Sequence, residues 1–320
     1  MGPCYARGLA QTLHRGEDYV LQIDSHMRFR RNWDEYLIQQ CNSIKEQTSN
    51  KKVMLTTYPV GYTLPNNIPK DETRGTYLVP WKFDDNGMLR QRGRLLKDKE
   101  DTGGDDHGNS TTAPVSLDKH YLFAGGFNFA PAAQVLQDVP YDTMGLPHLF
   151  FGEELSMAVR LFTHGYDLYA PKETVAYHLW SRSHRPPPSP SQIVASSSSG
   201  GRDDGEAEQA KTRRLKANNS RDKVVRQLLG DASTIGAPYG LGNERNAEDF
   251  ASHLGVDFIN RKFTREDYED GELTRNDFVA ESLQASTDSS SLFPEDSLEA
   301  KVASLDSKIA SKIAFFLNGI

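Results

Sequence analysis

The triplet Asp24-Ser25-His26 follows the apolar run Tyr19–Ile23 and carries two side chains that can bind a metal ion. Side chains at i and i+2 of a strand point to the same side, so a strand here would direct Asp24 and His26 together beyond its end. One carboxylate oxygen and one imidazole nitrogen make half a site for a divalent ion such as Mn²⁺. The triplet could equally be a turn in which Asp24 hydrogen-bonds its own backbone.

A pair of carboxylates, Glu153 and Glu154, follows Phe151-Gly152 at the start of a segment with helical apolar spacing. Acidic residues are favoured in a first helical turn by the helix dipole, which is one interpretation of the pair. The other is a site that grips hydroxyl groups, because a carboxylate accepts hydrogen bonds from two neighbouring sugar hydroxyls. The paired glycines Gly125-Gly126 lie in a strand-like segment and indicate a bulge or a place where a ligand approaches the backbone.

A third group of candidate residues is His178-Leu179-Trp180, directly after the predicted strand Thr174–Tyr177. A lone histidine is often structural, but the position of His178 at a strand end favours metal ligation. Arg7 lies on a short amphipathic helix predicted over residues 5–14, where it could face a nucleotide or solvent. Both interpretations of Arg7 stay open.

The composition excludes several classes of function. The 320 residues carry a net charge of −7 with a pI near 5.7, so we expect no nucleic-acid partner. Two cysteines are too few for a disulfide framework, no run of about 18 apolar residues predicts a transmembrane segment, and the N-terminus lacks the features of a signal peptide. We expect a cytoplasmic protein, or one of the Golgi lumen if a preceding segment carried an anchor. No P-loop or serine-hydrolase motif is present.

Helical and strand-like segments alternate along most of the chain, which is typical of an α/β fold. We expect a catalytic core over residues 1–184, a disordered low-complexity insertion over 185–222, a C-terminal part of the catalytic domain over 223–280, and an acidic, serine-rich tail over 281–320. The tail carries a predicted amphipathic helix whose apolar face is formed by Leu298, Val302, Leu305, Ile309 and Ile313.

Four motifs in this order carry a family resemblance: Ile23-Asp24-Ser25-His26, Ala124-Gly125-Gly126, Phe151-Gly152-Glu153-Glu154, and Val175-Ala176-Tyr177-His178-Leu179-Trp180. The order resembles that of the retaining polypeptide glycosyltransferases of the GT-A fold. It is most similar to the hydroxyproline N-acetylglucosaminyltransferases that modify the adaptor subunit of SCF-type ubiquitin ligases, and more distantly to mucin-type polypeptide N-acetylgalactosaminyltransferases. The likeness spans residues 3–184, and more weakly 236–262.

The resemblance implies a mixed central sheet flanked by helices. Proteins of this family carry a first strand–helix unit ahead of the part that matches Met1–Leu13, so we expect that unit to be missing here. It also implies that Asp24, His26 and His178 bind a divalent ion, Mn²⁺ or Mg²⁺, which bridges the two phosphates of UDP. A cation there stabilises the charge that grows on the diphosphate as the glycosidic bond breaks.

Further roles are implied for the remaining motif residues. Glu153 and Glu154 would orient the donor sugar or the acceptor as the catalytic pair. Gly125 and Gly126 would line the sugar pocket, and Trp180 would contact the donor together with Arg7. No covalent nucleophile stands out, so the resemblance implies a front-face retaining route in which the donor phosphate acts as base.

The predicted function is transfer of N-acetylglucosamine from UDP-N-acetylglucosamine to a protein hydroxyl, on hydroxyproline, serine or threonine. The SCF ubiquitin-ligase adaptor is a candidate acceptor. Two other hypotheses remain: a truncated, non-catalytic relative that acts as a binding or regulatory module, and a metal-dependent phosphoester hydrolase, since Asp-x-His pairs also serve such enzymes.

Overall fold

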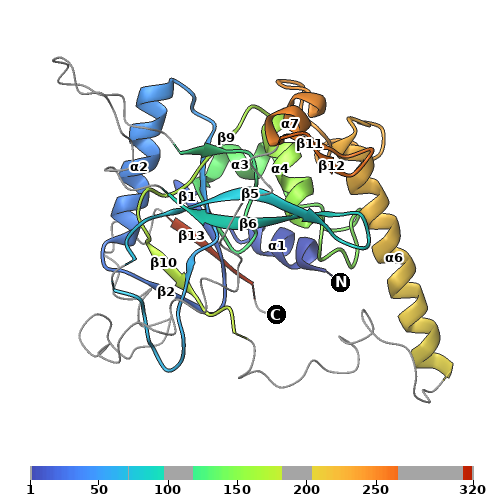
Figure 1. Ribbon diagram of the computed structural model, residues 1–320, viewed down its shortest axis with the longest axis horizontal. Helices are drawn as coiled ribbons and strands as arrows, with labels where there is room; N and C mark the ends of the chain where they lie inside the picture. Colours follow the sequence, from blue (N-terminus) through green and yellow to red (C-terminus); the bar gives the residue numbers. More distant parts are fainter. Residues whose placement is uncertain (1, 71, 97–117, 182–203, 266–312, 319–320) are drawn as a thin grey trace.

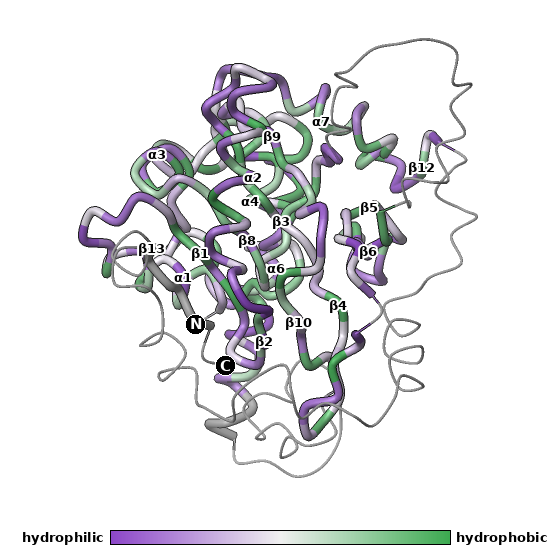
Figure 2. Tube along the Cα trace, turned by 90° about the vertical axis from the view of Figure 1, so that its left-hand side faces the viewer, coloured by the Kyte–Doolittle hydropathy of each residue, from purple (hydrophilic) through white to green (hydrophobic). Residues whose placement is uncertain are grey.

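A six-stranded mixed sheet forms the centre of the protein. The computed structural model describes residues 2–70, 72–96, 118–181, 204–265 and 313–318. The sheet has the order β13-β1-β8-β3-β9-β7, and Figure 2 shows β13, β1, β8 and β3 next to one another. Its strands are β1 (Tyr19–Asp24), β3 (Val53–Thr56), β7 (Lys119–His120), β8 (Phe127–Pro131), β9 (Asp167–Tyr169) and β13 (Ile313–Asn318). Parallel and antiparallel pairs occur together, which confirms the predicted mixed sheet.

The central strands are buried on both faces, so helices must cover both. Alternate residues of β1 enter different cores: Leu21 and Ile23 pack with the helix α2 (Trp33–Thr48), whereas Val20 packs on the opposite side with α4 (Glu153–Thr163). Figure 1 shows α2 and α4 on different sides of the sheet. The sheet is therefore an interior layer that fixes the strand ends firmly.

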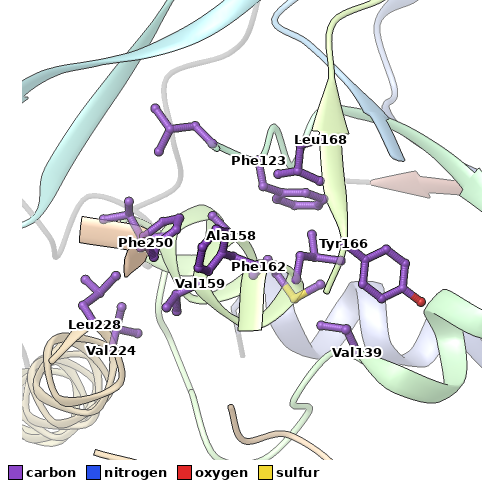
Figure 3. Packing of buried hydrophobic residues seen from close by; sticks show 14 of the residues in the cluster. Phe123, Val139, Ala158, Val159, Phe162, Tyr166, Leu168, Val224, Leu228 and Phe250 are labelled. Atoms are coloured by element: carbon purple, nitrogen blue, oxygen red, sulfur yellow. The ribbon is translucent and has the colours of Figure 1, made fainter. Parts of the chain in front are cut away.

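The larger core lies around α4. The Phe162 ring of this helix packs at a tilt of 52° against Phe250 of α7 (Ala247–Leu254), with ring centroids 5.6 Å apart, and Phe123 and Leu168 pack above it (Figure 3). Leu228 closes the cluster from the side. The remaining helices of this region are α1 (Pro3–Gln11), α3 (Ala132–Asp138) and α6 (Asp204–Leu228).

Three smaller sheets surround the central one. The first has the order β2-β10-β4, the second is the hairpin β5–β6, and the third is β11–β12. Their strands are β2 (Met27–Phe29), β4 (Val60–Gly61), β5 (Thr76–Phe83), β6 (Leu89–Leu95), β10 (Ala176–His178), β11 (Val256–Asp257) and β12 (Lys262–Phe263). The hairpin turns at Asn86-Gly87, where Gly87 has φ +75°, a conformation that favours glycine.

The predicted disordered insertion extends too far, because residues 204–222 belong to α6. This segment is rich in alanine, lysine, arginine and glutamate, which are good helix formers, although its apolar spacing is poor. Its last turns are held by Val224 and Leu228 in the core and by the Ser220 hydroxyl, which donates to Pro147 O at 2.9 Å. The helix runs along one side of the molecule (Figure 1). Residues 185–203 lie outside the described part.

The predicted tail helix is wrong at its C-terminal end, because Ile313–Asn318 forms the strand β13. It pairs in parallel with β1, from Tyr19↔Ile313 to Asp24↔Asn318. The segment Ile-Ala-Phe-Phe-Leu-Asn is rich in strand-favouring residues. Without β13, the edge of β1 would have unpaired backbone groups, so a strand is favoured there. The other residues of the predicted helix face, Leu298, Val302, Leu305 and Ile309, lie outside the described residues.

No helix in the described parts of the chain has both the length and the apolar character that a bilayer span needs.

A buried histidine on β7 predicts a pH dependence of stability. The Nε2 atom of His120 lies 3.1 Å from Thr56 O, and burial lowers the pKa of His120 to about 4. The unfolded chain therefore binds a proton at higher pH than the folded protein. This stabilisation is complete above about pH 6.5 and is lost as the pH falls toward 4, at about 1.4 kcal/mol per pH unit within that interval.

Urea unfolding at several pH values checks this prediction. His120→Gln should reduce the slope of unfolding free energy against pH between about 6.5 and 4. Equal slopes in the original protein and His120→Gln would contradict the assignment.

Candidate metal and sugar site

Asp24, His26 and His178 come together although the two histidines lie far apart in the chain. One ligand atom of each lies within 4.8 Å of the others. His178 Nε2 is 3.2 Å from Asp24 Oδ2, and the rings of His26 and His178 have centroids 4.3 Å apart. His178 is buried and Asp24 is partly exposed, so the group opens to solvent on the side of Asp24. The structure thus unites the three predicted metal ligands.

The pairing of two short strands explains this arrangement. β10 runs antiparallel to β2, with His178 opposite Met27, and the Leu179 N–H donates to His26 O at 3.2 Å. These contacts set His178 beside the residue that follows the triplet. Because Asp24 ends β1 and His178 ends β10, the three residues sit where the central sheet meets the β2-β10-β4 sheet.

The donor set suits a divalent cation of intermediate softness. A carboxylate oxygen and two imidazole nitrogens are common ligands of such ions, and imidazole in particular favours transition metals over Ca²⁺. Three ligand atoms within 4.8 Å can reach one ion, since ligand bonds of about 2.1 Å put opposite ligands about 4.2 Å apart. The residues present therefore fit a metal ion after small side-chain adjustments.

Glu153 is locked in a buried network. It forms an ion pair with Arg7 of α1 and accepts a hydrogen bond of 2.8 Å from the Tyr141 hydroxyl. The Gln22 amide, on β1, donates to Tyr141 Oη at 3.0 Å and to Gly125 O at 2.7 Å. Burial lowers the pKa of Arg7, but the attraction of the Glu153 carboxylate outweighs burial. The pKa therefore lies above its usual value, and the guanidinium stays charged. The network ties α1, β1 and α4 to the glycine pair.

Arg7 was expected to contact the donor, and the structure places its guanidinium in the interior instead. Its exposed fraction is 7%, and it lies 5.7 Å from the centre of the Tyr141 ring. A donor contact by Arg7 stays a prediction. Its direct partner is Glu153.

Glu154 is partly exposed and its two oxygens are held separately. Oε1 accepts from the Gly125 N–H at 2.9 Å, and Oε2 accepts from the Tyr58 hydroxyl at 2.7 Å and from the Gln91 amide at 3.2 Å. Burial and the neighbouring Glu153 raise the pKa of Glu154, against the hydrogen bonds from Tyr58 and Gly125, which lower it. The carboxylate is thus fixed in place on a residue that is partly exposed.

The glycine pair lies between Asp24 of the candidate metal site and Glu154. Gly125 donates to Glu154, and the Asp24 N–H donates to Gly126 O at 3.1 Å. A Cβ at Gly126 would lie 2.9 Å from Asp24 Oδ2, and one at Gly125 would lie 2.5 Å from Arg7 Nη1. Each glycine therefore makes room for a specific side chain, and Asp24 and Glu154 meet adjacent residues of one short segment.

Two residues that the sequence analysis missed complete the site. Tyr58, after β3, and Gln91, on β6, both bond Glu154. Trp180, which was predicted as a donor contact, packs on His178 with ring centroids 3.9 Å apart, and its indole N–H donates to Pro59 O at 3.1 Å. The available signal for Tyr58 was its position at the end of a predicted strand, directly before Pro59.

Comparison with known proteins identifies the family. A family model described as "Glycosyltransferase (GlcNAc)" matches residues 1–260. The chain belongs to this glycosyltransferase family. The match confirms the predicted enzyme class.

Individual proteins share little sequence with this chain. No curated protein matches it. Among solved structures, it is similar to one described as "Crystal structure of GalNAc-T7 with UDP, GalNAc and Mn2+", with 15% sequence identity and a TM-score of 0.41. The aligned region covers 84% of this chain and 44% of that one, so the glycosyltransferase spans less than half the length of that protein.

Alanine substitution of Gly126 should affect metal binding, whereas alanine substitution of Gly125 should affect stability. Gly126→Ala pushes on the Asp24 carboxylate and should weaken Mn²⁺ binding about tenfold or more, with unfolding changed little. Gly125→Ala meets the buried Arg7 guanidinium and should cost roughly 1–3 kcal/mol of unfolding free energy. Calorimetric Mn²⁺ titration and urea unfolding measure the two effects.

Gly236→Ala is the matched control, because no atom lies within 4 Å of a Cβ there. It should bind Mn²⁺ and unfold like the original protein. Undiminished Mn²⁺ binding by Gly126→Ala would show that Asp24 is not a ligand in the position described.

Proposed function

We propose that this chain is a metal-dependent retaining glycosyltransferase of the GT-A type, which transfers N-acetylglucosamine from UDP-N-acetylglucosamine to a protein hydroxyl. The observation that carries the proposal is the approach of the triad Asp24, His26 and His178 to Glu154 across Gly125-Gly126. A diphosphate is bound through a cation, and the hydroxyls of a sugar are bound by hydrogen-bond acceptors such as a carboxylate. The diphosphate and the sugar are adjacent in a UDP-sugar. The site offers both kinds of partner side by side.

The triad would hold Mn²⁺ or Mg²⁺ and, through it, the diphosphate. When bound, a divalent ion supplies positive charge to the leaving diphosphate. The backbone of β10 fixes the position of His178, which is buried, while Asp24 is open to solvent. A rigid histidine beside an accessible carboxylate leaves room for phosphate oxygens at the open side.

We propose different roles for the two glutamates. Glu154 would accept hydrogen bonds from hydroxyls of the donor sugar, because the residue is partly exposed and its carboxylate is held by Gly125, Tyr58 and Gln91. Glu153 would position the site through Arg7, without touching substrate. Preorganised acceptors of this kind cost no reorganisation during reaction.

The family description favours N-acetylglucosamine as the sugar. For the acceptor, the motifs named above support hydroxyproline, serine or threonine, with the SCF ubiquitin-ligase adaptor as the candidate protein. A retaining outcome follows from the same resemblance.

A transfer assay tests the function. The chain is incubated with UDP-N-acetylglucosamine or UDP-N-acetylgalactosamine, with Mn²⁺ or excess chelator, and with peptides that differ only in hydroxyproline, serine or proline at one position. We expect metal-dependent transfer of N-acetylglucosamine to the hydroxylated peptides, with retained anomeric configuration by NMR. Donor binding without transfer would favour a non-catalytic module, and turnover of simple phosphoesters would favour a hydrolase.

Charge removal at Glu154 should affect transfer, whereas charge removal at Glu153 should affect stability. Glu154→Gln should lower transfer at least a hundredfold with little loss of stability, because it removes the negative charge of the acceptor that would bind the sugar hydroxyls. Glu153→Gln should cost roughly 3–5 kcal/mol of unfolding free energy, because the Arg7 cation stays buried without its counter-charge. Glu248→Gln, in the first turn of α7 and exposed, is the control and should change neither quantity. The reverse pattern for Glu153 and Glu154 would refute the division of roles.

A further inference from the structure

We infer that Tyr58 is a positioning residue for sugar transfer, which holds the Glu154 carboxylate with its hydroxyl and supports Trp180 behind the metal histidine with its ring. The inference rests on the proposed function of this site and adds a residue that links its two halves. It places the support in the short connection between β3 and β4, outside the four sequence motifs.

The hydroxyl of Tyr58 has a defined direction. A phenol carries a single donor hydrogen, and the Gln91 amide donates to the same oxygen at 2.9 Å. The phenolic hydrogen is therefore available for Glu154 Oε2, 2.7 Å away. Gln91 is itself fixed, because its amide donates to Phe123 O at 2.8 Å. Glu154 is thus held through Oε2 by Tyr58, while Oε1 is held by the Gly125 N–H.

The ring of Tyr58 faces the metal side of the site. It meets the Trp180 ring edge-on, with centroids 5.8 Å apart and an interplanar angle of 79°. Trp180 packs against His178 at 3.9 Å, and its indole N–H donates to Pro59 O, next to Tyr58 in the chain. Continuous contacts therefore run from Glu154 through Tyr58 and Trp180 to His178.

This linkage matters because the donor spans both halves. Its diphosphate belongs at the triad and its sugar at Glu154, so the separation of the two must be held while the bond between them breaks. A displacement of about 1 Å in such a site can reduce the rate about a hundredfold. Proline after Tyr58 restricts the backbone at this position to extended conformations, which makes the connection suited to a rigid support.

Tyr58→Phe tests the hydroxyl alone, since it keeps the ring against Trp180. We expect kcat for transfer to fall about tenfold or more, while the Mn²⁺ dissociation constant stays within about twofold. The groups that face Glu154 are Tyr58, Gln91, the Gly125 N–H, Glu153 and Arg7. Loss of the Tyr58 donor should raise the pKa of Glu154, so the acidic limb of the pH–rate profile should move to higher pH.

Tyr58→Leu removes the edge contact with Trp180 as well. It should weaken Mn²⁺ binding severalfold in addition to the loss of transfer, because Trp180 loses one of its supports behind His178. Tyr58→Leu with the same Mn²⁺ affinity as Tyr58→Phe would overturn the role of the ring.

Tyr166→Phe is the matched control, because Tyr166 also donates its hydroxyl to a carboxylate, Asp138 Oδ2 at 3.1 Å, on α3. It should leave kcat and the pH–rate profile unchanged. If Tyr58→Phe loses no more activity than this control, the inference is overturned and the proposed function stands.

A second readout does not need turnover. The carboxyl carbon of Glu154 can be followed by ¹³C NMR in protein labelled at glutamate, with its signal assigned by its absence in Glu154→Gln. The pKa of Glu154 should be higher in Tyr58→Phe than in the original protein. An unchanged pKa of Glu154 in Tyr58→Phe overturns the inference, whether or not the protein transfers sugar. Absence of transfer in the assay above refutes the proposed function separately.

Discussion

The buried ion pair between Arg7 and Glu153 is the constraint on which the site depends. Burying a charge is costly unless a partner and further hydrogen bonds compensate, so the guanidinium and the carboxylate fix each other's positions. Tyr141 and Gln22 extend the pair to the carbonyl of Gly125. The first helix, the first strand, α4 and the glycine segment are consequently held in one arrangement.

The site is built where separate parts of the fold meet. Asp24 ends a strand of the central sheet, His178 ends a strand of the three-stranded sheet, and Glu154 starts a helix that spans the main core. Each side chain lies at the end of a regular element, where backbone geometry is firm but the surface is open. Such a site can be rigid and accessible together, which transfer of a flexible UDP-sugar would need.

Some of this arrangement could be predicted from the sequence. Asp24 and His26 stand two residues apart after an apolar run, so their proximity is a local feature, although β1 ends at Asp24 and Ser25-His26 form a bend instead of continuing the strand. The helix start at Glu153 is also a local feature. These predictions succeeded because short-range geometry determines them.

Other features depend on tertiary contacts that local patterns do not encode. The approach of His178 requires the β10–β2 pairing, and the partner of Arg7 lies on a helix that begins far along the chain. The segment 204–222 has helix-forming composition without an apolar stripe, so it resembled a linker. Ile313 fitted a helical spacing, yet the open edge of β1 pairs with it as a strand.

The most direct test of the account is a crystal structure of the protein with Mn²⁺ and UDP-N-acetylglucosamine, with the metal located by its anomalous scattering. The account predicts one strong peak bound by Asp24, His26 and His178, with the diphosphate on that ion and a sugar hydroxyl within hydrogen-bonding distance of Glu154. A manganese ion bound elsewhere, or a sugar directed away from Glu154, would contradict it.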